Sequence, residues 1–203
     1  MRIVQPDDDG FDAAVRALRA GQIVVHPTDT VYGLAVDPLN VAALDRLAKV
    51  KRREAGQTFL LIATHWMQIV EAIGEVSEEI QAFSANFWPG PLTLMLTPSN
   101  RVPKQLLGPS GKIGVRIPAC DVARVLCSRF GRVLVSTSAN RTGQAPALRT
   151  ADVNIDGVTL AIEGGTLRPS APSTIYDPLT RQILRPGAVN AAAIEAAMSD
   201  AAD

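Results

Sequence analysis

The chain has 203 residues, 47% hydrophobic and 20% charged, and its 20 basic and 20 acidic side chains cancel to a formal charge of zero. This balance is typical of a globular protein and gives no indication of a nucleic-acid or membrane partner. No apolar run approaches the length of a membrane span, and the N-terminus lacks the apolar core of a signal peptide, so we expect a soluble cytoplasmic protein. No linker-like segment divides the chain, which predicts one domain over residues 1–203.

The first part of the chain alternates helical and extended patterns. Acidic residues 7–9 precede F-D-A-A-V-R-A-L-R-A-G, which predicts an amphipathic helix that ends at Gly21. Apolar runs predict strands at 23–27, 59–63, 91–97 and 113–118, and helical spacing predicts helices at 41–50, 66–73, 77–87 and 121–130.

The later part reads as mostly extended. A buried strand is expected at 133–136, followed by a polar loop to about residue 149. Shorter strands are expected at 158–162, 174–176 and 182–184, and an alanine-rich helix from Asn190. This irregular alternation, with hairpin-like spacing near the C-terminus, predicts an α/β fold with a mixed parallel and antiparallel sheet covered by helices on both faces.

The residue inventory argues against two common kinds of active site. Cys120 and Cys127 stand seven apart on an expected helix, as small core residues would, and there is no paired C-x-x-C and no H-E-x-x-H for zinc. The chain holds only two histidines, His26 and His65, and Ser138 lacks the G-x-S-x-G setting of a hydrolase nucleophile.

Polar segments follow several of the expected strands. P-T-D-T-V-Y-G-L follows the strand at 23–27, S-T-S-A-N follows the strand at 133, and Arg116 stands inside the apolar I-G-V-R-I-P. Strand ends of this kind can converge on one ligand crevice. Two alternatives remain open, because Thr28 to Thr30 also suit a capped turn and Arg116 also suits a structural ion pair.

Lys51 and Arg53 form the most specific charged pair. A separation of two residues places both side chains on one side of an extended segment. A compact ammonium beside a forked guanidinium suits a polyphosphate, and no glycine-rich phosphate loop is present to serve instead. The alternative is a solvated helix end.

Seven ordered motifs together resemble the YrdC-like family, the threonylcarbamoyl-AMP synthases of tRNA modification. They are H-P-T-D-T-V-Y-G-L (26–34), K-R-R (51–53), F-W-P-G-P-L-T-L (87–94), G-V-R-I-P (114–118), S-T-S-A-N-R-T-G (136–143), S-T-I-Y-D (173–177) and I-L-R-P-G-A (183–188). The resemblance implies a YrdC/RibB-like twisted, open mixed sheet with a deep, positively lined cavity.

It also implies a nucleotidyltransferase that uses L-threonine, bicarbonate and ATP, with Mg²⁺ carried by ATP and no metal ligands from protein side chains. The threonylcarbamoyl group would pass to tRNA through a partner complex. Carried over by motif, Lys51 and Arg53 bind the ATP phosphates and serve catalysis. The other implied residues are Ser138, Asn140, Ser173 and Arg185 for ATP, and Thr30, Tyr32 and Arg116 for threonine.

Gln57 and Thr58 depart from the short synthases, which often carry another lysine after the K-x-R pair. This local stretch is closer to YciO-like paralogues. The alternative to a synthase is therefore an RNA- or nucleotide-binding module without synthase activity. In such a module, the cations near residue 50 would bind RNA weakly. The intact S-x-N motif favours the synthase. The resemblance does not include the additional C-terminal domain of longer family members.

Overall fold

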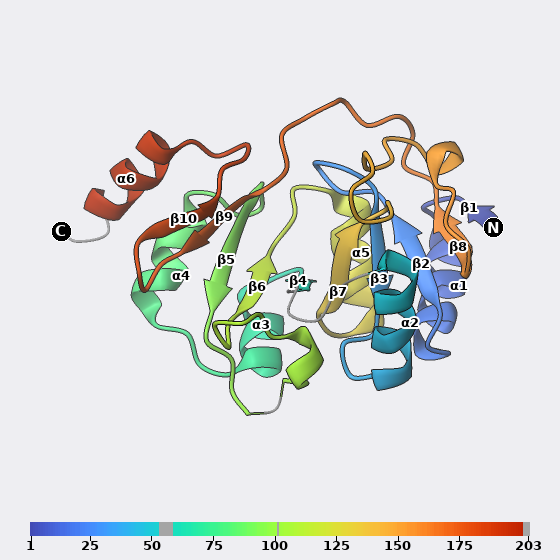
Figure 1. Ribbon diagram of the computed structural model, residues 1–203, viewed down its shortest axis with the longest axis horizontal. Coiled ribbons are helices and arrows are strands. Elements are labelled where there is room, and N and C mark those ends of the chain that lie inside the picture. The colour runs from blue at the N-terminus through green and yellow to red at the C-terminus, as the bar shows by residue number, and fades with distance from the viewer. Residues whose placement is uncertain (53–58, 101, 201–203) are drawn as a thin grey trace.

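A ten-stranded twisted sheet runs through the molecule, in the order β1-β8-β2-β3-β7-β4-β6-β5-β9-β10. The structure is a computed structural model that describes residues 1–52, 59–100 and 102–200. Figure 1 shows the sheet passing from the N-terminal side of the molecule to the C-terminal side, where β9, β10 and α6 lie. The predicted α/β class is confirmed.

The strands mix both directions. Four neighbouring pairs are parallel (β1 with β8, β8 with β2, β4 with β6, β5 with β9), and the remaining pairs are antiparallel. The strands are β1 (Arg2–Val4), β2 (Ile23–His26), β3 (Gly33–Val36), β4 (Leu60–Ile62), β5 (Leu92–Leu96), β6 (Ile113–Arg116), β7 (Leu134–Ser138), β8 (Val158–Ile162), β9 (Thr174–Asp177) and β10 (Gln182–Arg185). The helices are α1 (Asp8–Arg19), α2 (Val41–Lys51), α3 (Trp66–Ile73), α4 (Glu78–Ala85), α5 (Asp121–Phe130) and α6 (Ala191–Asp200), with short 3₁₀ turns at Lys104–Leu106 and Thr150–Asp152.

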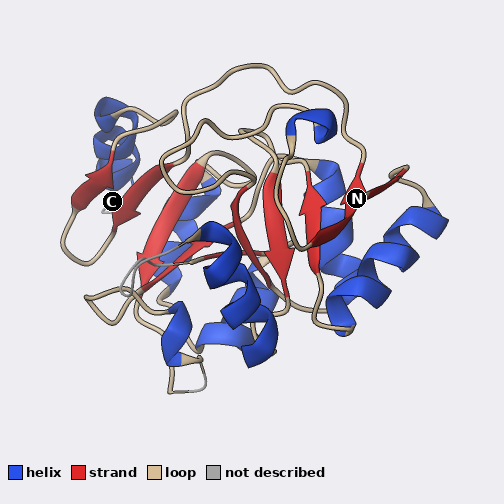
Figure 2. Ribbon diagram, turned by 45° about the vertical axis from the view of Figure 1, so that its right-hand side comes forward, coloured by secondary structure: helices blue, strands red, loops and turns tan. Residues whose placement is uncertain are grey.

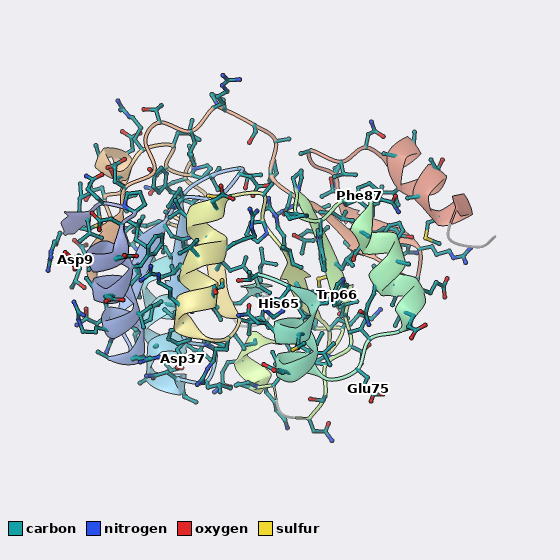
Figure 3. All side chains as sticks on the ribbon, turned by 180° about the vertical axis from the view of Figure 1, so that it is seen from behind. Asp9, Asp37, His65, Trp66, Glu75 and Phe87 are labelled. Atoms are coloured by element: carbon teal, nitrogen blue, oxygen red, sulfur yellow. The ribbon has the colours of Figure 1, made fainter. Side chains whose placement is uncertain are left out.

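Alternate residues of the central strands enter two separate cores, as the pleat of a sheet requires. Val24, Ala35 and Leu134 pack with α1 and α5, whereas their neighbours Val25 and Leu34 pack with α2, α3 and α4. Figure 3 shows α1 and α5 side by side on the first of these faces. In Figure 2 the helices flank the strands, and long loops pass over one end of the sheet.

The differences from the sequence prediction concern mainly short strands. β1 and β3 were not expected, and β3 is a central strand whose four residues are all buried. A short run buried on both faces has no alternation to reveal it. β7 extends to Ser138, so the motif S-T-S lies inside the strand rather than in the following loop. The predicted helix at 77–87 is shorter, at Glu78–Ala85, and Cys120 precedes α5 while Cys127 is buried within it.

A buried histidine ties β2 to β7 across β3. His26 is fully buried, and its Nε2 lies 3.0 Å from Ser136 Oγ while its Nδ1 lies 3.0 Å from the Pro27 carbonyl oxygen. The ring passes over Gly33, where a Cβ atom would lie only 2.8 Å from both His26 Nε2 and Ser136 Oγ. Glycine at this position therefore permits the contact. Burial lowers the pKa of His26 to about 4, although the hydrogen bond to Pro27 opposes this shift.

This shift predicts acid sensitivity. The pKa is lower in the folded than in the unfolded chain, so the contribution of His26 to stability is complete above the unfolded pKa of about 6.5 and falls as the pH drops towards 4. We expect the wild type to lose about 2 kcal/mol more unfolding free energy between pH 7 and pH 5 than His26→Gln, measured by urea denaturation. His65→Gln, at an exposed position, is the matched control. Equal pH dependence of the wild type and His26→Gln would contradict the expectation.

Candidate functional site

A cavity of about 520 Å³ lies on the sheet face that also carries α1 and α5. No described residue of either helix lines it. Its floor consists of residues from four adjacent strands, β7, β4, β6 and β5, because Ser136 is paired with Leu60, Leu60 with Gly114, and Gly114 with Met95. The walls come from the turn after β2, the segment after β7 and the loop that precedes β9, which Figure 1 shows crossing from β8 to β9. The predicted crevice is therefore present.

One end of the cavity is organised by Lys51, the last residue of α2. Its side chain is buried, and Nζ donates to the carbonyl oxygens of Ser138 and Asn140, both at 2.6 Å. It also lies 2.8 Å from Asn140 Oδ1 and 3.3 Å from Ser138 Oγ. An ammonium has three protons, so some of these contacts share a donor. The structure thus brings together Lys51, Ser138 and Asn140, as the motifs predict.

The same segment is held to α2 by a second contact. The Thr142 hydroxyl donates to the Lys51 carbonyl oxygen at 2.7 Å, and the Ser138 hydroxyl donates to Asn140 Oδ1 at 2.6 Å. Ser138 and Asn140 line the cavity, whereas Lys51 supplies positive charge from behind them. Arg53, Gln57 and Thr58 lie outside the described residues, so their predicted roles stay predictions.

Arg116 lies elsewhere in the same cavity. It is 3% exposed, and its Nε donates to the Gly90 carbonyl oxygen at 2.8 Å. Its Nη2 lies 2.5 Å from Asp29 Oδ2, and Nη1 lies 3.5 Å from the Thr30 hydroxyl. Arg116 therefore forms a structural ion pair and also lines the cavity, and its contact with threonine stays a prediction.

The pair of Arg116 and Asp29 is close but poorly aligned for hydrogen bonding. Within the described residues, Nη2 and both Asp29 carboxylate oxygens are buried without a hydrogen-bond partner. Burial lowers the pKa of Arg116 and the Asp29 charge raises it, and a guanidinium remains protonated at neutral pH. Buried donors left without hydrogen bonds are costly, so a ligand carboxylate that supplied acceptors here would gain strong, charge-assisted bonds.

Asp29 takes part in the site as the ion-pair partner of Arg116, although the sequence motifs imply no role for it. The turn interpretation is also correct for its neighbour Thr28, whose hydroxyl donates to the Val31 carbonyl oxygen at 2.6 Å and accepts from the Thr30 and Val31 amides. A tight turn of this kind directs Asp29 towards β6 and leaves Thr30 lining the cavity.

Ser173 and Arg185 lie beside Arg116 rather than beside Lys51. Arg185 Nη2 donates to the Ser173 carbonyl oxygen at 2.8 Å, and the Ser173 hydroxyl is 2.9 Å from that of Thr93. Desolvation lowers the pKa of Arg185, and the positive charge of Arg116 lowers it further. Both residues line the cavity, and their contact with a nucleotide stays a prediction.

Tyr32 is not among the described residues that line the cavity. Its ring is fully buried, and its hydroxyl donates to the Gly165 carbonyl oxygen at 2.8 Å and accepts from the Gly164 amide. Burial and the charge of Glu163 raise its pKa to about 12. The structure thus places Tyr32 as an anchor of the loop after β8, and its contact with threonine stays a prediction.

The exposed cations near residue 50 form a separate, smaller hollow of about 290 Å³. Lys49, Arg52 and Arg141 line it together with Asp156, which pairs with Arg141 at 2.8 Å. Lys51 is buried and does not contribute to this surface, which leaves fewer cations for RNA than the sequence suggests. Among the described helices, none is long and apolar enough to cross a membrane.

Comparison with known proteins agrees with this geometry. A family model, Sua5/YciO/YrdC, described as telomere recombination, matches residues 16–187. The chain is 38% identical over 170 residues to a threonylcarbamoyl-AMP synthase of Thiobacillus denitrificans, covering 83% of this chain and 90% of that protein. It is 36% identical over 182 residues to the synthase of Idiomarina loihiensis, covering 87% and 97%.

Two solved structures have the same fold. The chain superposes on P. abyssi Sua5 in complex with L-threonine with a TM-score of 0.91 and 29% identity, covering 98% of this chain. It spans only 61% of the length of that Sua5 chain. On E. coli YciO the TM-score is 0.83 with 25% identity, covering 95% of this chain and 97% of YciO. The chain belongs to the Sua5/YciO/YrdC family.

Proposed function

We propose that this protein makes L-threonylcarbamoyl-AMP, pyrophosphate and water from L-threonine, bicarbonate and ATP. One observation carries the proposal. The Lys51 ammonium lies behind Ser138 and Asn140 at one end of the cavity, and the buried guanidinium of Arg116 lies elsewhere in the same cavity. One group suits phosphate oxygens and the other a carboxylate. The identity to threonylcarbamoyl-AMP synthases over most of the chain supports the same reaction.

At the nucleotide end, the Asn140 amide can donate to the phosphates, and the Ser138 hydroxyl can do so once it rotates away from Asn140 Oδ1, with the Lys51 charge directly behind both residues. Arg53 would add a forked donor from the following segment. The described residues around the cavity supply hydroxyls, amides and cations, a set that binds phosphate oxygens and leaves Mg²⁺ to be carried by ATP. Bound with ATP, the metal would neutralise part of the charge that gathers on the leaving pyrophosphate.

At the other end, Arg116 would bind the threonine carboxylate, and Thr30 lies within reach of its Nη1. Asp29 keeps the guanidinium in place before the substrate arrives. Arg185 contributes a second positive charge to this region and helps to retain an anion.

The reaction requires no protein nucleophile. The neutral threonine amine adds to carbon dioxide or bicarbonate to form a carbamate, and a carbamate oxygen attacks the α-phosphorus of ATP while pyrophosphate leaves. The role of the cavity is to place these atoms in line, and good placement of reactants lowers a barrier by about 7 kcal/mol or more. The threonylcarbamoyl group would then pass to tRNA through a separate transfer complex.

The assay that tests this proposal combines purified protein, Mg²⁺, ATP, L-threonine and labelled bicarbonate. We expect release of pyrophosphate and a labile adenylate that contains both threonine and the label. L-Alanine in place of threonine is the substrate control. If no adenylate forms while the protein retains RNA at physiological salt, the non-catalytic RNA-binding alternative replaces the synthase.

The Arg116 assignment predicts a selective loss of threonine affinity. Removing only one partner of a buried ion pair leaves an uncompensated charge, so the variant should be the double substitution Asp29→Asn with Arg116→Gln. We expect threonine binding to weaken at least about tenfold, with ATP affinity changed by less than about threefold, in calorimetric titrations. The exposed pair Arg149 and Asp152, changed in the same way, is the matched control. Equal loss of both ligands would refute the division of the cavity.

The Lys51 assignment predicts the reverse selectivity. Lys51→Met removes the charge behind Ser138 and Asn140, and we expect ATP affinity to fall at least about tenfold while threonine binding alone is retained. Lys49→Met, at an exposed position of the same helix, is the control. Should both variants weaken ATP equally, the effect would come from general charge and not from the buried ammonium.

A further inference from the structure

Glu163 stands directly after β8, at the start of the loop that crosses to β9 (Figure 1). The seven sequence motifs do not include it, and it does not itself line the cavity. Its backbone amide donates to the Val4 carbonyl oxygen at 2.8 Å, which continues the pairing of β8 with β1. The main chain of Glu163 is therefore fixed to the sheet.

The two carboxylate oxygens of Glu163 accept hydrogen bonds from two different segments. Oε2 accepts from the Thr150 hydroxyl at 2.6 Å, in the 3₁₀ turn of the segment after β7. Oε1 accepts from the Gly165 amide at 2.7 Å and from the Gly164 amide at 3.1 Å, in the loop to β9. The bond from Thr150 lowers the pKa of Glu163, although burial opposes the shift, so at neutral pH the side chain is an ionised acceptor.

The turn after β2 joins the same cluster through Tyr32. The Tyr32 hydroxyl oxygen lies 3.4 Å from Glu163 Oε1 and 2.9 Å from the Gly164 amide nitrogen. A Cβ atom at position 164 would lie only 2.5 Å from Cβ and Cγ of Pro27, so glycine permits this close approach. The three walls of the cavity thus meet around one carboxylate.

Residues 166–171 form a strap between this cluster and β9. The described residues give the strap two hydrogen bonds to other segments, from the Leu167 amide to the segment after β7 at 2.9 Å and from the Ser170 hydroxyl to the Thr30 carbonyl oxygen at 3.3 Å. Its residues are exposed apart from Leu167, and Ser170 lines the cavity. With so few contacts of its own, the strap depends for its position on its ends, and Glu163 fixes one of them.

The position of these walls matters for a reaction that depends on placement. Walls around a cavity exclude water and restrict the motion of the reactants, and a displacement of about 1 Å can slow a reaction about 100-fold. We propose that Glu163 is a positioning residue, which fixes the three walls around the reactants without touching them. This inference rests on the proposed function.

The contacts of Glu163 are separate from those of the two buried cations. Within the described residues, Lys51 and Arg116 have hydrogen-bond partners of their own, and Glu163 shares none of them. Loss of the Glu163 contacts should therefore slow the reaction more than it weakens the binding of either substrate. General destabilisation of the protein would not produce this difference.

The test measures kcat for adenylate formation, together with calorimetric binding of ATP and of L-threonine. Glu163→Met keeps the side-chain length but removes both carboxylate acceptors, and Thr150→Val removes one hydrogen bond. We expect kcat to fall about thirtyfold in Glu163→Met and about fivefold in Thr150→Val, with both affinities changed by less than about threefold. Glu163→Gln can still accept from the glycine amides and can donate to Thr150, so kcat should return to within about threefold of the wild type.

Hydrogen exchange of the amides at positions 164–168 reports on the walls without any substrate. We expect faster exchange there in Glu163→Met and exchange close to that of the wild type in Glu163→Gln. Asp177→Leu is the matched control, because Asp177 also accepts from two backbone amides and from one side chain, Lys112, but does not line the cavity. It should lower the unfolding free energy, measured by urea denaturation, and leave kcat unchanged.

Four outcomes would overturn the inference. If Asp177→Leu lowers kcat as much as Glu163→Met at a similar loss of unfolding free energy, the effect is general destabilisation. If Glu163→Gln is as slow as Glu163→Met, the negative charge matters and the hydrogen bonds do not. Unchanged kcat in both Glu163→Met and Thr150→Val would show that the reaction does not depend on these contacts. Failure of the wild type to form the adenylate would instead refute the proposed function, and the inference would fall with it.

Discussion

The buried ammonium of Lys51 joins two segments that no strand pairing connects, the end of α2 and the segment that follows β7. Among the described residues, Ser138 and Asn140 together give it four oxygen contacts, so one charge helps to fix the position of both residues at the cavity wall. A buried ammonium needs such compensation, because an unpaired one would be strongly destabilising. The need to satisfy this charge therefore shapes the end of the cavity.

The same rule operates at the other end with different groups. Arg116 is held by the Gly90 carbonyl oxygen and by Asp29, and both contacts exist before any substrate is present. Cations that are already fixed lose little side-chain freedom when a ligand binds, and they need not reorganise as charge develops during a reaction. Such a cavity can favour a reaction by placement and charge, in a chain whose only two histidines are the buried His26 and the exposed His65.

Much of this architecture could be predicted from the sequence, for reasons that the structure makes clear. α1 and α5 have strong amphipathic patterns with acidic residues in the first turn, and the apolar runs of β2 and β5 are buried throughout. The sequence pattern does not indicate β3, because a run of four buried residues has no periodicity. The ion pair of Asp29 cannot be read from the sequence because its partner Arg116 lies far away along the chain, and pairing of this kind depends on strand order. The roles of Tyr32, Ser173 and Arg185 depend on how loops return to the sheet, which local pattern does not encode.

The close passage of the His26 ring over Gly33 has a consequence for how this protein can vary. Any side chain at position 33 would collide with the ring and with the Ser136 hydroxyl, so these three positions form one steric unit. A lineage that replaced the imidazole with a smaller group would relax only part of the restriction on the glycine, because Ser136 Oγ would lie equally close to a Cβ atom, and it would also remove the described hydrogen-bond partner of the Ser136 hydroxyl. Substitutions at positions 26, 33 and 136 are therefore expected to be inherited as compatible sets rather than independently.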